Sequence, residues 1–153
     1  MAALFTVNTG AVASPSNTTK VAVQLASTAT KTCKIVGIDI TFDGTDATKT
    51  PILVTIARET GVSSTGGSAP TPARAGGDAS VTSAMTARIS DTTDGASPTV
   101  LCGWYIPPTS GFSYQFPLGR EITMFISDFI ALRVTTVTAS GTPNYDATVW
   151  YEE

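Results

Sequence analysis

The sequence predicts an all-β protein, an eight-stranded antiparallel jelly-roll sandwich with an extended N-terminal arm and one long inserted loop. β-Branched and aromatic residues recur in short runs of alternating apolar and polar positions, which is typical of strands. Gly, Pro and Asp separate these runs, and only residues 79–89 could hold a helical turn. About eight antiparallel strands of this length commonly pack as a two-sheet jelly roll. A chain of 153 residues is long enough for one such domain.

Three strands are expected before the inserted loop. Residues 1–19 show no sustained alternation and predict an arm that precedes a single domain over residues 20–153. The first alternating runs cover residues 20–28, 33–42 and 52–58. The segment "FDGTD" supplies the short polar side chains of a turn, and Pro51 opens the third strand where no ladder donor is needed.

Five strands are expected after the inserted loop. The loop covers about residues 60–98, is rich in Gly, Ser, Thr, Ala and Pro, and is much longer than an ordinary connection. The later strands are expected over residues 99–106, 112–118, 120–126, 129–137 and 145–152. An immunoglobulin-like sandwich is the alternative, but Trp104 follows both cysteines and the Cys–Trp–Cys order is absent.

The composition restricts the classes of partner. Charged residues make up 14% of the chain, against roughly 25% in ordinary soluble domains. Such a surface carries little self-repulsion and suits packing against other subunits, although a secreted β-domain can have a similar composition. The net charge is −3 without a Lys/Arg cluster, so we expect no nucleic-acid binding. No signal peptide is recognised, and the longest apolar run is interrupted by Asp128, so no membrane span is expected.

The residues that carry chemistry do not predict an enzyme. The chain has no His and no G-x-S-x-G or S-x-x-K motif, so the commonest base and nucleophile patterns are missing. Carboxylates could act in pairs on a glycoside, and the candidates are Asp39, Asp43, Asp46, Glu121 and Asp128. Most of them lie at turns, where short polar side chains bond their own backbone. We therefore expect no catalytic residues, no cofactor and no metal, with calcium binding at "FDGTD" left as an alternative.

The two cysteines have two interpretations. Cys33 and Cys102 each lie inside a predicted strand, and without His they cannot complete a zinc site. They are either buried thiols that pack as small apolar side chains or a disulfide between neighbouring strands.

Candidate partner-interface residues are arginines and apolar residues of the arm. An Arg in a strand rich in hydroxyl groups often meets a carboxylate across an interface, although it can also face solvent. The candidates are Leu4, Phe5, Val7, Arg58, Arg88, Arg120 and Arg133.

Several segments resemble the jelly-roll head decoration (cement) proteins of tailed phages. These are "VGIDITFDGTDATKTPILVTIAR", "GVSSTGGSAPTP", "VLCGWYIPPTSGFSYQFPLGREITM" and "LRVTTVTASGTPNYDATVWYEE". They share with that family a "FDGTDA"-like turn, a "P-x-x-V" strand, a "P-L-x-R-E" step and a terminal Glu-Glu after an aromatic strand. The resemblance spans about residues 33–153.

The resemblance implies a structural virion protein. Such proteins form homotrimers on the outer surface of a phage head, bind the major capsid protein and stabilise the shell. The N-terminal arm would reach neighbouring trimers, where an extended segment can add a strand to a sheet edge. The protein would be made in the host cytoplasm and located on the capsid exterior, and the family has no catalytic residues to transfer.

The alternative function is a phage tail or head-fibre module that binds host-surface carbohydrate. That function requires an exposed aromatic platform with carboxylates nearby. The candidates are Trp104, Tyr105, and Tyr145 with Asp146.

Overall fold

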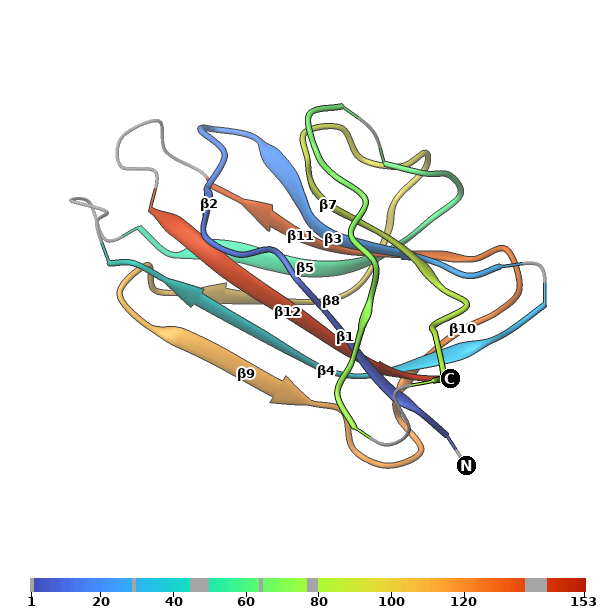
Figure 1. Ribbon diagram of the computed structural model, residues 1–153. Helices are drawn as coiled ribbons and strands as arrows, with labels where there is room; N and C mark the ends of the chain where they lie inside the picture. Colours follow the sequence, from blue (N-terminus) through green and yellow to red (C-terminus); the bar gives the residue numbers. More distant parts are fainter. Residues whose placement is uncertain (1, 29, 45–49, 64, 77–79, 137–142) are drawn as a thin grey trace.

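The chain folds as an all-β sandwich of two antiparallel sheets in the computed structural model (Figure 1). The structure describes residues 2–28, 30–44, 50–63, 65–76, 80–136 and 143–153. Within these ranges there are twelve strands and no helix. The strands are β1 (Leu4–Asn8), β2 (Val12–Ala13), β3 (Thr19–Ala26), β4 (Cys33–Phe42), β5 (Ile52–Glu59), β6 (Ala73–Arg74), β7 (Thr86–Asp91), β8 (Thr99–Ile106), β9 (Gly111–Gln115), β10 (Ile122–Met124), β11 (Phe129–Thr135) and β12 (Asn144–Glu152).

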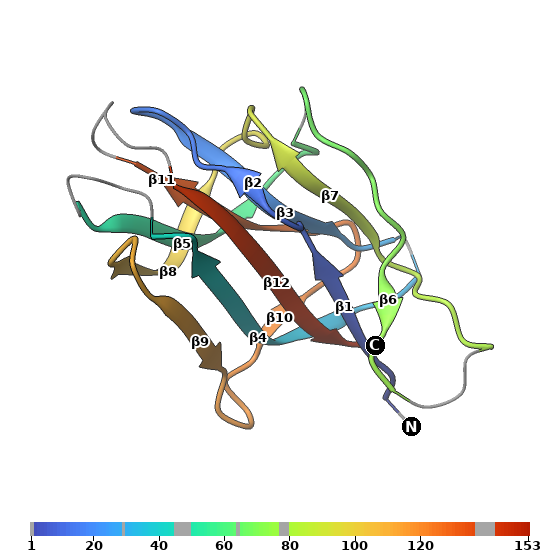
Figure 2. The same ribbon diagram turned by 60° about the vertical axis from the view of Figure 1, so that its left-hand side comes forward.

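Strands distant in sequence lie side by side in both sheets. Sheet A has seven strands in the order β10-β4-β12-β1-β6, with β9 paired to β4 and β2 paired to β12. Sheet B has five strands in the order β7-β3-β11-β5-β8. The two chain ends lie close together (Figures 1 and 2), because the backbones of Ala3 and Glu153 exchange two hydrogen bonds of 3.1 Å.

The core lies between the sheets and follows from the period-two alternation of the strands. Inward side chains of sheet A, such as Ile38, Ile40 and Val149, pack against inward side chains of sheet B, such as Ile56 and Leu132. Burying each such side chain contributes about 1.5–3 kcal/mol to stability. The outward positions of the same strands remain available to form surfaces.

The predicted N-terminal arm is wrong for its first residues. Leu4–Asn8 forms β1, which pairs with β12 on one side and with β6 on the other. Phe5 and Val7 are only 1% and 3% exposed, and the Phe5 ring stacks on Tyr151 with centroids 5.6 Å apart. The sandwich therefore begins inside the segment expected to precede it. Two inward apolar residues are too short a pattern to identify a strand from sequence.

The inserted loop of residues 60–98 is partly sheet. It contains β6, which extends sheet A beside β1, and β7, which extends sheet B beside β3. Met85 and Ala87 of this segment are buried in the core. Together with β1 and the short β2, these strands raise the number above the eight expected.

Seven of the eight predicted strands are confirmed with small changes at their ends. The eighth strand, expected over residues 120–126, is much shorter in the structure and covers only Ile122–Met124. The chain turns immediately afterwards, because the side chain of Asp128 accepts hydrogen bonds from the backbone N–H of Phe125 (3.3 Å) and from Arg58. The turn after Phe42 contains Gly44 at a φ of 75°, whereas Asp46 lies outside the described residues.

Candidate functional site

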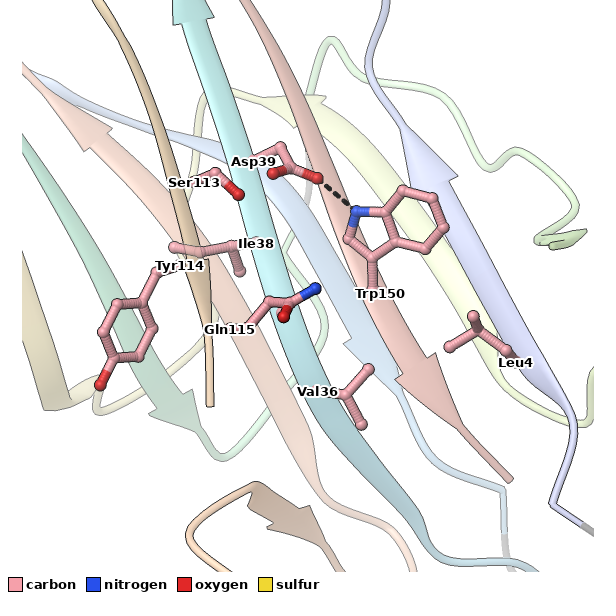
Figure 3. A pocket seen from close by; sticks show the side chains of 9 residues that line it. Leu4, Val36, Ile38, Asp39, Ser113, Tyr114, Gln115 and Trp150 are labelled. Atoms are coloured by element: carbon pink, nitrogen blue, oxygen red, sulfur yellow. Dashed lines mark hydrogen bonds between the residues drawn. The ribbon is translucent and has the colours of Figure 1, made fainter. Parts of the chain in front are cut away.

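A groove on the outer face of sheet A forms a cavity that is open to solvent (Figure 3). It has a volume of about 250 Å³ and runs across β9, β4, β12 and β1. The residues that line it are Leu4, Val36, Gly37, Ile38, Asp39, Ser113, Tyr114, Gln115 and Trp150.

An irregularity in the pairing of β4 and β12 forms the floor of the groove. Trp150 lies opposite Gly37, whereas the next residue, Tyr151, lies opposite Ile35, so Val36 is the extra residue of a bulge. Gly37 contributes no side chain at this point. A Cβ there would lie 3.3 Å from the carbonyl oxygen of Tyr114 and 3.7 Å from Cγ of Gln115. The missing side chain therefore leaves the hollow between Gln115 and Trp150 open.

The half-buried side chain of Trp150 is held in a fixed position. Its indole Nε1–H donates a hydrogen bond to Oδ2 of Asp39 on the neighbouring strand. Figure 3 shows the broad face of the indole turned outward, with Gln115, Ser113 and Asp39 on one side and Leu4 on the other. An apolar ring face with polar groups beside it can bind a ligand that has both characters.

Three polar groups around the indole have no hydrogen-bond partner among the described residues. They are Oδ1 of Asp39, the hydroxyl of Ser113 and the side-chain amide of Gln115. Nearby polar groups on the same face are paired instead, since the amide of Asn8 donates to Asp146 (2.6 Å) and to Thr148 (2.8 Å). The three free groups therefore lie together in the lining of the groove.

A second surface, the apolar edge, consists of exposed side chains on β8 and on the segments after β9 and after β10, and β8 and β9 border the two sheets. Both views of the fold place these strands on the same side (Figures 1 and 2). Tyr105 is 70% exposed and Leu118 is 96% exposed. The apolar edge comprises Val100, Leu101, Tyr105, Leu118, Phe125 and Ile126. Only two other large apolar side chains of the described residues, Val62 and Val81, are similarly exposed.

Aromatic side chains close the gap between the sheets beneath the apolar edge. Trp104 of β8 contacts Phe112 and Tyr114 of β9, with ring centroids 5.1 and 5.3 Å apart. Tyr114 also contacts Phe116 edge-on at 5.1 Å. Such pairs contribute about 0.5–1.5 kcal/mol each beyond the area they bury. Trp104 therefore packs within the sandwich rather than forming a free platform.

A buried polar network fastens the 60–98 segment to sheet B. The Gln24 amide donates to Glu59 and to the carbonyl of Gly61 (3.1 Å), while its Oε1 accepts from the backbone N–H of Ser63 (2.9 Å). The Ser63 hydroxyl donates to Asp91 at 2.9 Å. These side chains are buried, and each hydrogen bond replaces one that the unfolded chain makes with water.

The two acids of this network have opposite pKa shifts. Burial raises the pKa of the Glu59 carboxyl above its ordinary value of 4.5, although Gln24 opposes the shift. Burial also acts to raise the pKa of Asp91. Hydrogen bonds from Arg88 (2.6 and 2.7 Å) and from Ser63 outweigh burial and leave the pKa of Asp91 below its ordinary value of 3.8.

Three of the four candidate arginines have carboxylate partners within the chain. Arg88 binds Asp91, Arg133 binds Asp94, and Arg58 binds Asp128 while also donating to the carbonyl of Thr123 at 2.9 Å. These three guanidinium groups, which suggested a partner interface, are thus already paired with carboxylates of the same chain. Arg120 is exposed, and no carboxylate among the described residues pairs with it.

The apolar interface candidates of the arm separate into two groups. Phe5 and Val7 belong to the core and are not available to a partner, which corrects their assignment. Leu4 points outward and lines the groove.

The aromatic candidates for carbohydrate binding also divide. Tyr145 is buried at 1% exposure and cannot form a platform, and burial raises its pKa to about 12. Tyr105 is exposed on the apolar edge.

The sequence analysis did not identify Trp150 as a surface residue, although the alternation of residues 145–152 indicates its outward position. Its neighbours Val149 and Tyr151 face inward, so Trp150 occupies the outward phase.

The carboxylate candidates have separate partners. Asp39 accepts from Trp150, Asp43 accepts from Asn144 (2.8 Å), and Glu121 lies 4.0 Å from Lys34. Over the described part of the chain, no group of three or more His, Cys, Asp or Glu side chains is arranged to hold a metal ion.

Cys33 and Cys102 are free thiols. Cys33 is buried and its thiol lies 3.5 Å from the sulfur of Met124, which agrees with its interpretation as a buried thiol that packs as a small apolar side chain.

None of the described segments forms a helix long and apolar enough to cross a membrane.

Comparison with known proteins gives no relative for this chain. No family model matches it, and neither a curated protein nor a solved structure is significantly similar to it.

Proposed function

We propose that the chain is a structural virion protein, a capsid decoration or cement protein that binds the outside of a phage head as a trimer. The apolar edge is the observation that carries this proposal. Strand β8 alone exposes Val100, Leu101 and Tyr105, and exposed apolar surface of this kind on a soluble domain marks an interaction surface. Strand β8 also lies at the border of sheet B without a charged residue or a proline, and natural edge strands that stay unpaired usually carry such protection.

The proposal includes a jelly-roll topology for the sandwich. The strand order supports it, because β12 lies between β1 and β4 while β11 lies between β3 and β5. Eight of the strands then divide into β1-β12-β4-β9 and β3-β11-β5-β8, with successive strands of this set mostly alternating between the sheets. In this arrangement β6 and β7 are additions to the two borders opposite the apolar edge.

In this proposal, three copies associate through their apolar edges around a three-fold axis. Removing apolar surface from water contributes roughly 25 cal/mol per Å². The low content of charged residues, 14%, reduces the desolvation cost of bringing further surfaces against the shell. The protein would then bridge copies of the major capsid protein and stabilise them mechanically, without a catalytic step. It would be made in the host cytoplasm and located on the capsid exterior.

Light scattering of the purified chain tests the trimer. We expect three times the chain mass for the native protein and a smaller species for the double variant Leu101→Lys/Tyr105→Lys. The matched control is Val62→Lys/Val81→Lys, which changes two exposed apolar residues that do not belong to the apolar edge as defined. A native protein that stays monomeric at high concentration would contradict the trimer.

Copy number in purified particles tests the virion role. Gel densitometry should find this chain in numbers comparable to the major capsid protein. A few copies per particle would place the chain in a tail or fibre, and complete absence from particles would overturn the proposal. Shells that lack the chain should also disassemble at lower temperature than decorated shells.

A further inference from the structure

We propose that the groove of β9, β4, β12 and β1 binds one ring of a neutral carbohydrate. This inference does not rest on the decoration function, because the groove lies on the outer face of sheet A and the apolar edge borders the sandwich. A protein can therefore have either property without the other.

The indole of Trp150 supplies the stacking surface. Its hydrogen bond to Asp39 fixes the ring, so little side-chain freedom is lost when a ligand covers it. The face of an aromatic ring carries partial negative charge, whereas the C–H groups on one side of a pyranose carry partial positive charge. A sugar ring laid on the outward face of Trp150 would therefore gain both contact area and electrostatic attraction.

The polar groups around the indole match the hydroxyl groups of a sugar. Oδ1 of Asp39 accepts hydrogen bonds, whereas the amide of Gln115 and the hydroxyl of Ser113 can both donate and accept. None of the three has a partner within the described residues. A purely apolar ligand would desolvate them without compensation, which is costly, whereas a polyhydroxylated ring can satisfy all three.

The charge of the groove favours a neutral ligand. Its lining contains the carboxylate of Asp39 and no Lys or Arg. A phosphate, a sulfated glycan or an acidic sugar would be repelled by Asp39 without a cation to offset the repulsion. A metal ion would find one carboxylate where hard cations require six or more oxygen ligands.

The size of the groove matches a single ring. Its volume of about 250 Å³ is slightly below the roughly 300–1,000 Å³ of pockets that enclose drug-sized ligands. The groove is open along the sheet, so neighbouring sugar units of an oligosaccharide could extend beyond it. The affinity for one chain should be millimolar, and several copies of the protein would raise it through avidity.

Nitrogen-edited NMR of the full chain tests the proposal directly. The sequence contains only two tryptophans, so the spectrum has two indole N–H signals, from Trp150 in the groove and from Trp104 beneath the apolar edge. The probes are maltohexaose, lactose, mannobiose and triacetylchitotriose, each raised to tens of millimolar. We expect at least one probe to shift the Trp150 signal saturably while the Trp104 signal stays in place.

Variants of the groove residues test whether the sugar probe binds in the groove. Ser113→Ala/Gln115→Ala should weaken binding of the active probe at least tenfold, as read from the Trp150 signal. Trp150→Ala removes that signal, and in this variant the probe should no longer shift the backbone N–H signals of the groove residues. The control Thr41→Ala removes an exposed hydroxyl from the same strand as Asp39, outside the groove, and should leave binding unchanged. The Trp104 signal reports whether each variant is folded. The proposal is overturned if no probe shifts the Trp150 signal, or if the folded variants bind as the native protein does.

Discussion

The side-chain carboxylate of Glu153 accepts hydrogen bonds from the backbone N–H of Ala84 with both oxygens, at 3.1 and 3.0 Å. The same carboxylate accepts from the hydroxyl of Ser83, which also contacts the hydroxyl of Tyr151 at 2.7 Å. The end of β12 thus holds the inserted segment close to the point where β7 begins. The Glu153 side chain is only 3% exposed, so these bonds are shielded from water.

Replacing Glu153 with Ala should therefore destabilise the protein. The partly buried backbone N–H of Ala84 would lose its acceptor, whereas that of Met85 would keep the Ser83 hydroxyl at 3.0 Å. An unsatisfied buried donor costs about 1–3 kcal/mol. Urea unfolding should show a lower midpoint, and proteolysis within residues 80–85 should become faster. Glu152→Ala is the control, since its side chain makes no such contact among the described residues. Equal stability of the two variants would contradict this role of Glu153.

The free energy of unfolding should depend on pH through Glu59. Its folded-state pKa is raised by burial, so the native state binds a proton more tightly than the unfolded state does. The contribution of Glu59 to stability is then complete below its unfolded pKa, the ordinary value of 4.5, and is lost as the pH rises through the folded-state value. The variant Glu59→Gln has no carboxyl group at this position, so it should not lose this contribution to stability as the pH rises.

Denaturant titrations of both proteins between pH 4 and pH 7, about the range over which a carboxyl with a raised pKa titrates, measure the effect. The stability of Glu59→Gln relative to the native protein should increase as the pH rises. A constant difference across this range would show that the Glu59 carboxyl titrates alike in the folded and unfolded chains.

Phe5 should contribute to the stability of the sandwich as a core residue does. Its ring is 1% exposed and stacks on Tyr151, so Phe5→Ala should lower the free energy of unfolding by about 3–5 kcal/mol. Thr6→Ala is the control in the same strand, because Thr6 alternates to the outer face. If Phe5 belonged to a detached arm, both variants would be equally stable, and thermal unfolding distinguishes these outcomes.

The two thiols should differ in reactivity. Burial raises the pKa of Cys33 to about 12, so almost no thiolate is present near neutral pH and the sulfur is inaccessible. Cys102 is half-buried and should react first with an aromatic disulfide reagent. In Cys102→Ser, labelling should occur only after denaturant is added. Rapid labelling of native Cys102→Ser would contradict the burial of Cys33.

Much of the fold could be predicted from the sequence because alternation is a local property. The runs that become β3, β4 and β5 show it over most of their length, and the scarcity of charge was visible in the composition. Strand β1 and the two-residue strands β2 and β6 could not be found in this way. They contain too few alternating positions, and the neighbours that hold them lie far away along the chain.

The candidate groove shows the same division. The sequence by itself determined that Trp150 and Asp39 each occupy an outward position, because residues two apart in a strand share a face. Only the tertiary structure decided that these residues, separated by 111 positions, meet across β12 and β4 beside the bulge at Val36. Alternation fixes the face on which a side chain lies, whereas strand order and register fix its neighbours. Order and register depend on how both sheets bury their inner faces at once.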